Sequence, residues 1–320
     1  MVHEMINFWE TLEGPILALA PMEDVTDAAF RSLIATYGKP SVMFTEFTSA
    51  DGLVLAPEKA QPLLRKKLMF SEKERPIVAQ LFSASPERME KAAVLVESLG
   101  FDGIDINMGC PVQEVVNTGC GAALIKNPAR ARELMRAAKS GAPSLALSVK
   151  TRIGYDKDDL DQWLPELLAE NPAAITIHAR TRKEMSAVPA HWDVMHRAVS
   201  MRDSAHVKTL ILGNGDVTDV PDALKKIADT GIDGAMLGRA IYGNPWLFSG
   251  RTDMPSQQEK IAGLIEHLRL FESLMSETTN YAVMKKHFKA YISGWDNAKD
   301  LRVRLMETTT VAEAVAVLQR

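Results

Sequence analysis

The sequence predicts an α/β protein: a TIM (β/α)8 barrel followed by a small C-terminal helical domain. Short apolar segments alternate with helical patterns along most of the chain. Strands that are apolar throughout and alternate with helices form a parallel sheet covered by those helices. Eight such units fit within ~250 residues, which is the usual size of this barrel. After Trp246 the alternation stops and only helical patterns follow.

Each predicted strand is a short apolar run that stops at glycine, proline or a polar side chain, as buried strands do. The eight predicted strands are Ile16–Met22, Val42–Phe47, Ile77–Phe82, Gly103–Gly109, Leu145–Thr151, Ala174–Arg180, Thr209–Gly213 and Gly234–Gly238.

The helices between these strands have recognisable starts and stops. Ser85-Pro86 and Asn127-Pro128 each place a capping residue before proline, which is favoured at the first helical position. Gly231 is typical of a helix end. The helices predicted in this way are Thr26–Tyr37, Glu58–Leu68, one beginning after Ser85, Ala129–Lys139 and Asp222–Ala228. The second unit is the least regular, because a long loop from Ser49 leads to its helix.

A polar linker, Arg251–Ser256, separates two predicted domains, 1–250 and 256–320. Two apolar stripes at helical spacing follow the linker, the first from Ile261 to Met275 and the second from Tyr281 to Ile292. Asp300–Met306 and Val311–Leu318 are predicted as two further helices.

The composition is that of an ordinary soluble globular protein. The net charge is −4, so any nucleic-acid surface must be local. Two cysteines argue against a disulfide scaffold and fit a reducing cytoplasm. Residues 1–14 do not resemble a signal peptide, and the apolar runs are too short to span a membrane. We expect a cytoplasmic monomer without a metal site.

Polar side chains stand where the predicted strands end, and the active sites of TIM barrels lie at the carboxyl ends of the strands. In chain order these residues are Glu23, Glu46, Gln80, Asn107 with Cys110, Lys150 with Arg152, His178 with Arg180, Asn214 with Asp216, and Gly238 with Arg239. A single one of them has an ordinary structural explanation. Their convergence from eight strands indicates a functional barrel mouth.

The last two strands carry a second signal. Gly213-Asn214-Gly215-Asp216 and Gly238-Arg239-Ala240 place glycines directly after strands seven and eight. Free backbone N–H groups at this position, together with Arg239, are typical of the phosphate site of such barrels. A glycine after a strand also simply makes a turn, but the pair with an arginine favours a bound phosphate.

Cys110 follows the buried strand 103–109, on a sharp turn made by Gly109 and Pro111. A thiol can act as nucleophile or proton donor when its site tunes its pKa. The structural alternative is a small buried cysteine that fills space.

Taken together, these motifs resemble the tRNA-dihydrouridine synthases. The resemblance is carried by Ala20-Pro21-Met22-Glu23-Asp24-Val25-Thr26-Asp27, Asn107-Met108-Gly109-Cys110-Pro111, Ser148-Val149-Lys150-Thr151-Arg152, Ile177-His178-Ala179-Arg180-Thr181-Arg182, Gly213-Asn214-Gly215-Asp216 and Gly238-Arg239-Ala240. The match spans about residues 15–248, in the family's order, and 256–320 resembles the family's helical tRNA-binding domain more loosely.

The resemblance implies an FMN-dependent barrel that reduces the 5,6 double bond of a tRNA uridine with NADPH. It implies that Pro21, Met22 and Glu23 line the flavin, that Gln80 and Lys150 contact its ring, and that His178 lies beside it. Asn214, Gly215, Asp216, Gly238 and Arg239 would hold its phosphate. Asn107, Arg152 and Arg180 would contact the substrate, and Cys110 would donate the proton.

These implied roles are chemically sensible. Hydride from reduced flavin would reach carbon 6 of uridine, and carbon 5 must then be protonated from the opposite side by a neutral acid, for which a thiol with a pKa near ~8.5 is suited. The cation of Lys150 would stabilise negative charge on the reduced ring. The target base must leave its stack in tRNA to reach the flavin.

Two positions depart from the family's pattern. Cys120 stands where a small residue is usual, and we interpret it as a space-filling side chain in a tight loop. Lys183-Glu184-Met185-Ser186 replaces a stretch that often carries Gln-Gly-Tyr.

The C-terminal region is locally basic. Between Tyr281 and Arg304, six basic residues stand against two acidic ones; they are Lys285, Lys286, Lys289, Lys299, Arg302 and Arg304. A solvated helix face would explain them, but beside this barrel we favour contacts with tRNA phosphates, made chiefly by the first three.

Two other functions are compatible with parts of the sequence. One is another FMN-dependent barrel oxidoreductase acting on a small molecule, similar to dihydroorotate dehydrogenases or enoate reductases of the old yellow enzyme type. The other is a non-catalytic RNA-binding barrel. The Gly-Cys-Pro turn and the basic tail argue against the first, and the phosphate motif with Cys110 argues against the second.

Overall fold

The structure is a computed structural model that describes residues 7–320. Residues 1–6 lie outside the described residues. The predicted barrel domain and the segment 1–14 both begin with them. Within 7–320, nine strands form one parallel sheet in the order β1-β9-β8-β7-β6-β5-β4-β2, and β3 also pairs with β4. A parallel bridge between Ala18 and Val42 brings the two ends of the sheet together. The predicted TIM barrel is thereby confirmed.

The strands are short, and most of their side chains are buried on both faces of the sheet. Their bounds are β1 Ile16–Leu19, β2 Met43–Phe44, β3 Thr48–Ser49, β4 Ile77–Phe82, β5 Gly103–Met108, β6 Ala146–Gly154, β7 Ala174–Thr181, β8 Leu210–Asn214 and β9 Gly234–Leu237. β6 runs beyond its predicted end at Thr151, so Arg152 lies within it as well as Lys150.

The second unit differs from its prediction. Within the predicted strand Val42–Phe47 only Met43–Phe44 forms a strand, β2, and a second short strand, β3, begins after it at Thr48; both pair with β4. Between them the Thr45 hydroxyl accepts a hydrogen bond from the backbone N–H of Gln80 at 3.1 Å, in the place of a backbone carbonyl. The loop expected after Ser49 contains a helix, and the predicted helix 58–68 is a 3-10 turn followed by a short α-helix.

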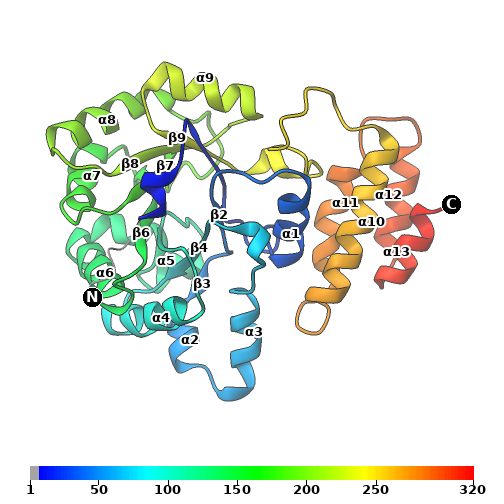
Figure 1. Cartoon of the computed structure of the whole chain (residues 1–320), viewed down its shortest axis with the longest axis horizontal. Helices are drawn as coiled ribbons and strands as arrows, with labels where there is room; N and C mark the ends of the chain where they lie inside the picture. Colours follow the sequence, from blue (N-terminus) through cyan, green and yellow to red (C-terminus); the bar gives the residue numbers. More distant parts are fainter. Residues whose placement is uncertain (1–6) are drawn as a thin grey trace.

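Most of the α-helices that alternate with the strands lie on the outside of the sheet, and four more α-helices follow the last strand (Figure 1). Their bounds are α1 Ala28–Tyr37, α2 Ala50–Leu55, α3 Gln61–Lys66, α4 Pro86–Ser98, α5 Gln113–Asn117, α6 Pro128–Gly141, α7 Leu160–Leu168, α8 Met195–Ser204, α9 Val220–Thr230, α10 Gln257–Leu274, α11 Lys285–Tyr291, α12 Ala298–Glu307 and α13 Val311–Leu318. Short 3-10 turns are η1 Phe8–Thr11, η2 Glu58–Ala60, η3 Glu72–Glu74, η4 Gly121–Lys126, η5 Trp192–Val194, η6 Arg239–Ile241 and η7 Tyr281–Met284.

The predicted caps are present. The Ser85 hydroxyl accepts from Arg88 N at the start of α4, and the Asn127 side chain accepts from Arg130 N at the start of α6. Gly231, with φ at 74°, ends α9 in the left-handed conformation that glycine favours.

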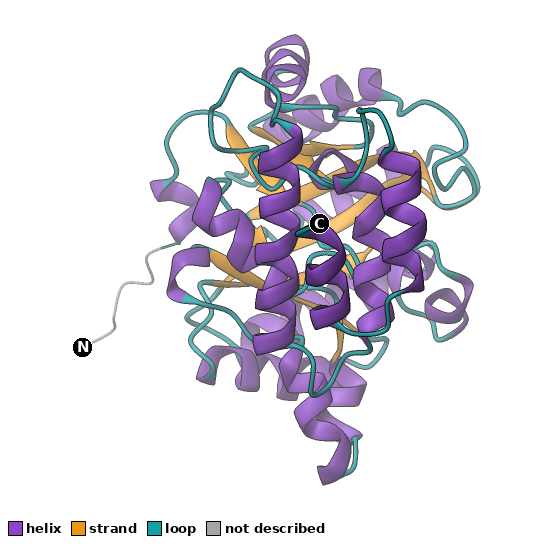
Figure 2. Cartoon of the chain, turned by 90° about the vertical axis from the view of Figure 1, so that its right-hand side faces the viewer, coloured by secondary structure: helices purple, strands orange, loops and turns teal. Residues whose placement is uncertain are grey.

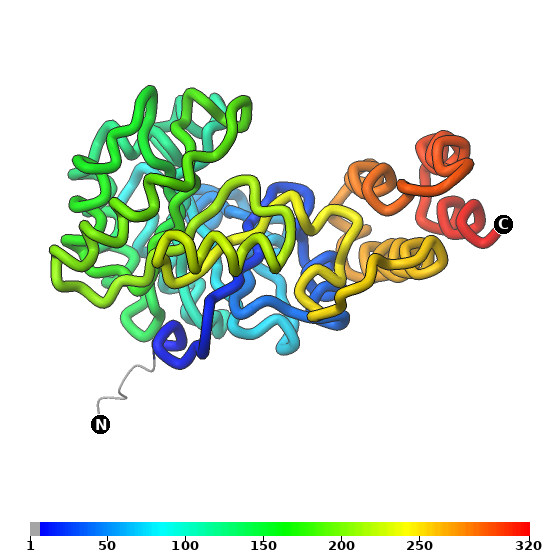
Figure 3. The backbone as a smooth tube through the Cα atoms, turned by 90° about the horizontal axis from the view of Figure 1, so that it is seen from above, coloured from blue at the N-terminus to red at the C-terminus, as the bar shows by residue number. Residues whose placement is uncertain are grey.

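The four C-terminal helices stand together beside the barrel (Figures 1 and 3), and Figure 2 views the molecule from this end. They share one hydrophobic core with α1. The Phe30 ring stacks on His267 of α10 at 4.7 Å, and Tyr37 donates to Glu266 at 2.6 Å. No helix among the described residues combines the length and apolar character needed to cross a bilayer.

Candidate active site

A cavity of about 640 Å³ opens at the carboxyl ends of the strands. Ten residues singled out from the sequence line it: Pro21, Met22, Lys150, His178, Arg180, Asn214, Gly215, Asp216, Gly238 and Arg239. Val217, Thr218 and Met236 also line it, although no motif of the sequence singles out these three positions. A larger cavity of about 810 Å³ lies at the opposite end of the barrel, but these polar side chains do not reach it.

The turn after β8 requires glycine at position 215. Gly215 has φ at +120°, and a Cβ there would lie 2.9 Å from the Cβ of Ala190 and 3.1 Å from the His178 ring. Trp192 Nε1 donates to the Gly215 carbonyl at 2.7 Å, which fixes the turn from outside. Asn214 Nδ2 donates to the Met236 carbonyl at 2.8 Å and ties β8 to β9. The backbone therefore approaches the cavity where a side chain would block it.

Asp216 lies between two arginines. Its carboxylate accepts a hydrogen bond from Arg180 and another from Arg239, the latter at 2.7 Å. The bond from Arg180 is the main reason that the pKa of Asp216 falls below its ordinary value. Arg180 is buried and also donates to the Val188 carbonyl at 2.6 Å, whereas the Arg239 side chain is 65% exposed. Arg239 is thus the better placed of the two arginines to reach a bound anion.

Lys150 and His178 lie deeper in the same cavity. Lys150 Nζ donates to Asn214 Oδ1 at 3.3 Å, and burial, reinforced by the charge of Arg152, lowers its pKa to about 8. Burial also lowers the pKa of His178 far below its usual range, so the ring is neutral at pH 7. Arg180 Nη1 lies 3.1 Å from His178 Nε2 and can only donate, which assigns the ring proton to Nδ1.

The turn that carries Cys110 is held by side chains on both sides. Asn107 Oδ1 accepts from Gly109 N at 3.1 Å and from Cys110 N at 2.9 Å. Arg152 Nε donates to the Gly109 carbonyl at 2.8 Å. Cys110 is 9% exposed, and burial raises the pKa of its thiol, so the thiol is protonated at neutral pH.

A buried chain of hydrogen bonds supports this turn. Asn107 Nδ2 donates to Gln80 Oε1 at 3.1 Å, and Gln80 Nε2 donates to Asp105 at 2.7 Å. Ser148 donates to the other Asp105 oxygen at 2.6 Å. Burial raises the pKa of Asp105 to about 6. Asp105 is not among the residues predicted from the sequence, although a carboxylate between Ile104 and Ile106 in a buried strand indicates a buried hydrogen-bond network.

Several predicted residues lie outside the cavity wall: Glu23, Gln80, Asn107, Cys110 and Arg152. Gln80 is fully buried and uses its amide within the network just described. Arg152 Nη1 donates to the carbonyls of Thr181 and Met185, both at 3.0 Å, and so connects the Cys110 turn to the divergent segment 183–186.

Cys120 lies in a tight loop, which agrees with the space-filling role predicted from the sequence. It is 3% exposed, and its Sγ lies 3.8 Å from the Thr118 carbonyl. The neighbouring Ala122 N donates to the Cys110 carbonyl at 3.0 Å, so this loop packs beneath the Cys110 turn.

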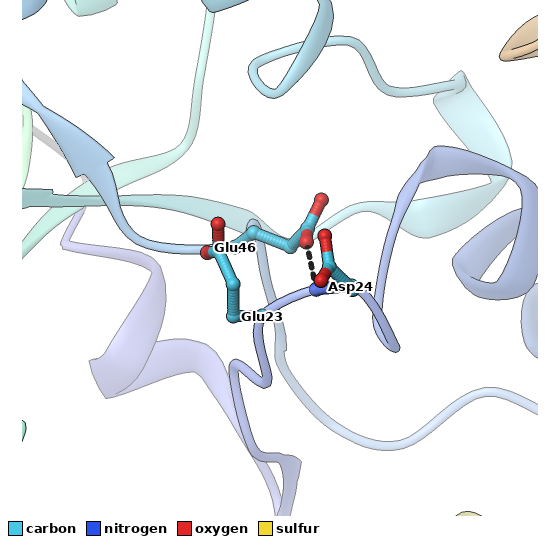
Figure 4. A group of neighbouring side chains, drawn as sticks. All are labelled: Glu23, Asp24 and Glu46. Carbon is cyan, nitrogen blue, oxygen red and sulfur yellow. Dashed lines mark hydrogen bonds between the residues drawn. The ribbon is translucent and has the colours of Figure 1, made fainter. Parts of the chain in front are cut away.

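Three carboxylates, those of Glu23, Asp24 and Glu46, lie within 4.8 Å of one another at the rim of the mouth (Figure 4). Glu46 accepts from Asp24 N at 2.6 Å, and burial raises the pKa of Glu46 to about 7. Two lysines meet this negative charge: Lys67 pairs with Glu23, and Lys286 pairs with Asp24 at 2.6 Å.

The three predicted tRNA-binding lysines lie around α11. Lys286 forms the pair with Asp24, which joins the C-terminal helices to the barrel rim. Lys285 donates to the Met306 carbonyl at 2.8 Å. Lys289 is exposed.

Known proteins resemble this chain in sequence over almost its whole length. The family model described as dihydrouridine synthase matches residues 18–320. A probable tRNA-dihydrouridine synthase 2 of Bacillus subtilis (strain 168) is 41% identical over 314 residues, which cover 98% of this chain and 95% of that protein. A probable tRNA-dihydrouridine synthase of Staphylococcus epidermidis (strain ATCC 35984) is 40% identical over the same shares of both chains.

Among solved structures, a 2-naphthoyl-CoA reductase in complex with 2-naphthoyl-CoA aligns with a TM-score of 0.54 at 11% identity, over 72% of this chain and 49% of that one, a likeness of fold alone. The match to the family model, by contrast, covers the strand ends, the Cys110 turn and the C-terminal helices. The chain therefore belongs to the dihydrouridine synthase family.

Proposed function

We propose that this chain is a tRNA-dihydrouridine synthase that reduces the 5,6 double bond of uridines in tRNA, with FMN as cofactor and NADPH as reductant. The names of its relatives support the reaction and the substrate. The observation that carries the proposal is a cavity with Gly215, Gly238 and Arg239 in its wall and a protonated thiol on a nearby turn. In this proposal residues 1–250 form the catalytic domain and 256–320 the tRNA-binding domain.

The residues present fit a flavin mononucleotide. The N–H groups near Gly215 and Gly238, with the exposed guanidinium of Arg239, suit one phosphate. Pro21 and Met22 provide an apolar wall for a ring, and Lys150 provides a cation beside it. When bound, FMN would take up reducing equivalents from NADPH and deliver a hydride to the uridine.

Cys110 would complete the reduction. Burial keeps its thiol protonated, and the bonds from the Gly109 and Cys110 N–H groups to Asn107 fix the turn that presents it. The thiol would give its proton to carbon 5 of the base, and the neighbouring cations of Lys150 and Arg152 would stabilise the thiolate left behind. Arg152 Nη2 has no hydrogen-bond partner among residues 7–320, which leaves it available to the base.

The cofactor assignment predicts a yellow protein that releases FMN on denaturation. Arg239→Ala should weaken FMN binding roughly tenfold. A charge-assisted hydrogen bond is worth ~1.5–3 kcal/mol, and the low end of this range applies because the Arg239 side chain is exposed. Fluorescence titration of apoprotein with FMN measures the change. Arg136→Ala, on the outer face of α6, is the control and should bind FMN as the unchanged protein does. Release of FAD, or failure to bind FMN, would contradict the assignment.

The substrate assignment predicts that the basic C-terminal helices contribute to tRNA affinity. The triple change Lys285→Gln, Lys286→Gln and Lys289→Gln should leave FMN binding and NADPH oxidation intact. It should weaken tRNA binding and reduce the salt dependence by roughly 0.7–0.9 log unit for each phosphate that the variant no longer neutralises. Binding titrations at several salt concentrations test this. A solvated helix face predicts the same tRNA affinity at every salt concentration.

A further inference from the structure

The segment 50–67, here called the arm, comprises α2, η2 and α3 and projects from the barrel (Figure 1). It follows β3 and so leaves the barrel at the rim that carries the active-site cavity. Its last residue, Lys67, pairs with Glu23 on the rim. Leu63 and Lys66 of the arm line a small cleft together with Asp24 and with Val283 of the C-terminal region. The arm and the C-terminal helices therefore flank the same loop of the barrel mouth.

The second half of the arm is positively charged. Residues 59–67 contain four basic side chains and no aspartate or glutamate, whereas the two carboxylates of the arm, Asp51 and Glu58, precede them. Lys67 is neutralised by Glu23, which leaves Lys59, Arg65 and Lys66. Lys59 and Arg65 are exposed and Lys66 is half-buried, and none of these three pairs with a carboxylate within residues 7–320. Three unpaired positive charges in a net acidic protein create a local site for an anion.

The arm also exposes apolar surface. Leu55 is 60% exposed and Leu63 is 51% exposed, among the largest values for large apolar side chains in the described structure. An exposed apolar surface bordered by charges of one sign is typical of a contact with another molecule. The charge favours a polyanion as the partner, because three basic groups that neutralise phosphates release the condensed counterions into solution. A protein surface would gain only where it is acidic.

We propose that the arm is a second RNA-binding surface, in which Lys59, Arg65 and Lys66 contact phosphates while α11 contacts others across the β1–α1 loop. This inference rests on the proposed function. The pairs Lys67–Glu23 and Lys286–Asp24 attach both basic elements to consecutive residues of one loop, so their positions relative to the cavity are linked. An RNA that delivers a base into the cavity passes this rim and meets both surfaces.

The test compares two triple variants that remove the same total charge. The arm variant carries Lys59→Gln, Arg65→Gln and Lys66→Gln. The control carries Lys91→Gln, Lys208→Gln and Lys225→Gln, which are exposed lysines on α4, before β8 and on α9. Binding of tRNA to each protein is titrated between low and high salt, and FMN content is measured in the same samples.

The arm variant should bind tRNA at least tenfold more weakly at ~0.1 M salt, with a slope of log affinity against log salt reduced by roughly 2 units for three phosphates. The control should keep the slope of the unchanged protein, and both variants should retain FMN. The conservative variant Lys59→Arg, Arg65→Lys and Lys66→Arg should restore the slope, because binding to phosphates needs charge at these positions rather than one residue type.

Equal tRNA affinities and equal salt slopes for the arm variant and the control would overturn the inference. The same result is expected if the arm binds a protein and not RNA. That result differs from failure of the proposed function, in which the unchanged protein itself neither binds tRNA nor forms dihydrouridine. An unchanged protein that is active, together with an arm variant that matches the control, would remove the arm from the RNA-binding surface and leave the enzyme assignment in place.

Discussion

Replacing Cys110 with alanine is expected to lower the rate of uridine reduction by about 10²–10⁴-fold, the usual effect of removing a proton donor. The reason is specific to one step, since the thiol would protonate the base and takes no part in holding the cofactor. Oxidation of NADPH in the absence of tRNA should therefore stay within about twofold of the unchanged protein. Single-turnover measurement of dihydrouridine by mass spectrometry, beside stopped-flow absorbance of the flavin, separates the two steps.

Cys120→Ala is the matched control. Both cysteines are buried, and they lie on loops that pack against each other, but within residues 7–320 the Cys120 thiol bonds only to the Thr118 carbonyl of its own turn. This variant should reduce uridine at nearly the normal rate. A dead Cys120 variant beside an active Cys110 variant would reverse the assignment of the proton donor.

The largest expected decrease in stability comes from Glu74→Ala. Arg31 of α1 is completely buried and donates to Glu74 at 2.7 Å, to the Thr26 carbonyl at 2.7 Å and to the Met69 carbonyl at 2.6 Å. Removing the carboxylate leaves a buried guanidinium without a counter-charge, which typically costs about 3–5 kcal/mol. We expect a melting temperature lower by roughly 10 °C, at a few degrees for each kcal/mol.

Glu72→Ala is the control for this variant, because Glu72 lies in the same 3-10 turn but its side chain is 81% exposed and pairs with Arg75 at the surface. Such a pair contributes at most ~1 kcal/mol. Thermal melts followed by circular dichroism should place the Glu72 variant near the unchanged protein. Similar melting temperatures for the two variants would show that Arg31 finds another counter-charge.

The barrel could be predicted because each unit is marked by local features of the sequence. Apolar runs mark the strands, and Ser85 and Asn127 mark helix starts through bonds to residues three positions away. The second strand could not be placed correctly, because its interruption depends on Thr45 bonding Gln80, 35 positions along the chain. Val42, Phe44, Thr45 and Phe47 all favour a strand, and Thr45 itself shows no local sign of that break.

The site could be predicted as a set of residues but not as a set of contacts. Strand ends indicate that Lys150, His178 and Arg239 converge, and they do line one cavity. The resemblance to the family implies that Asp216 helps to hold a phosphate, but it gives no hint that the Asp216 carboxylate pairs with two arginines. Which of several neighbouring charges pair is decided by distances between loops, and residue order carries no such distances.

The shared core of α1 and α10 has a consequence for how a uridine would be selected. Phe30 stacks on His267 and its ring centroid lies 5.0 Å from that of His287, so the C-terminal helices are fixed to the barrel by packing rather than suspended from a linker. The spacing between the cavity and the basic face of α11 is then constant. In the proposed function, RNA phosphates that contact α11 lie at a fixed distance from the cavity, and this distance selects the uridine that reaches the cavity for reduction.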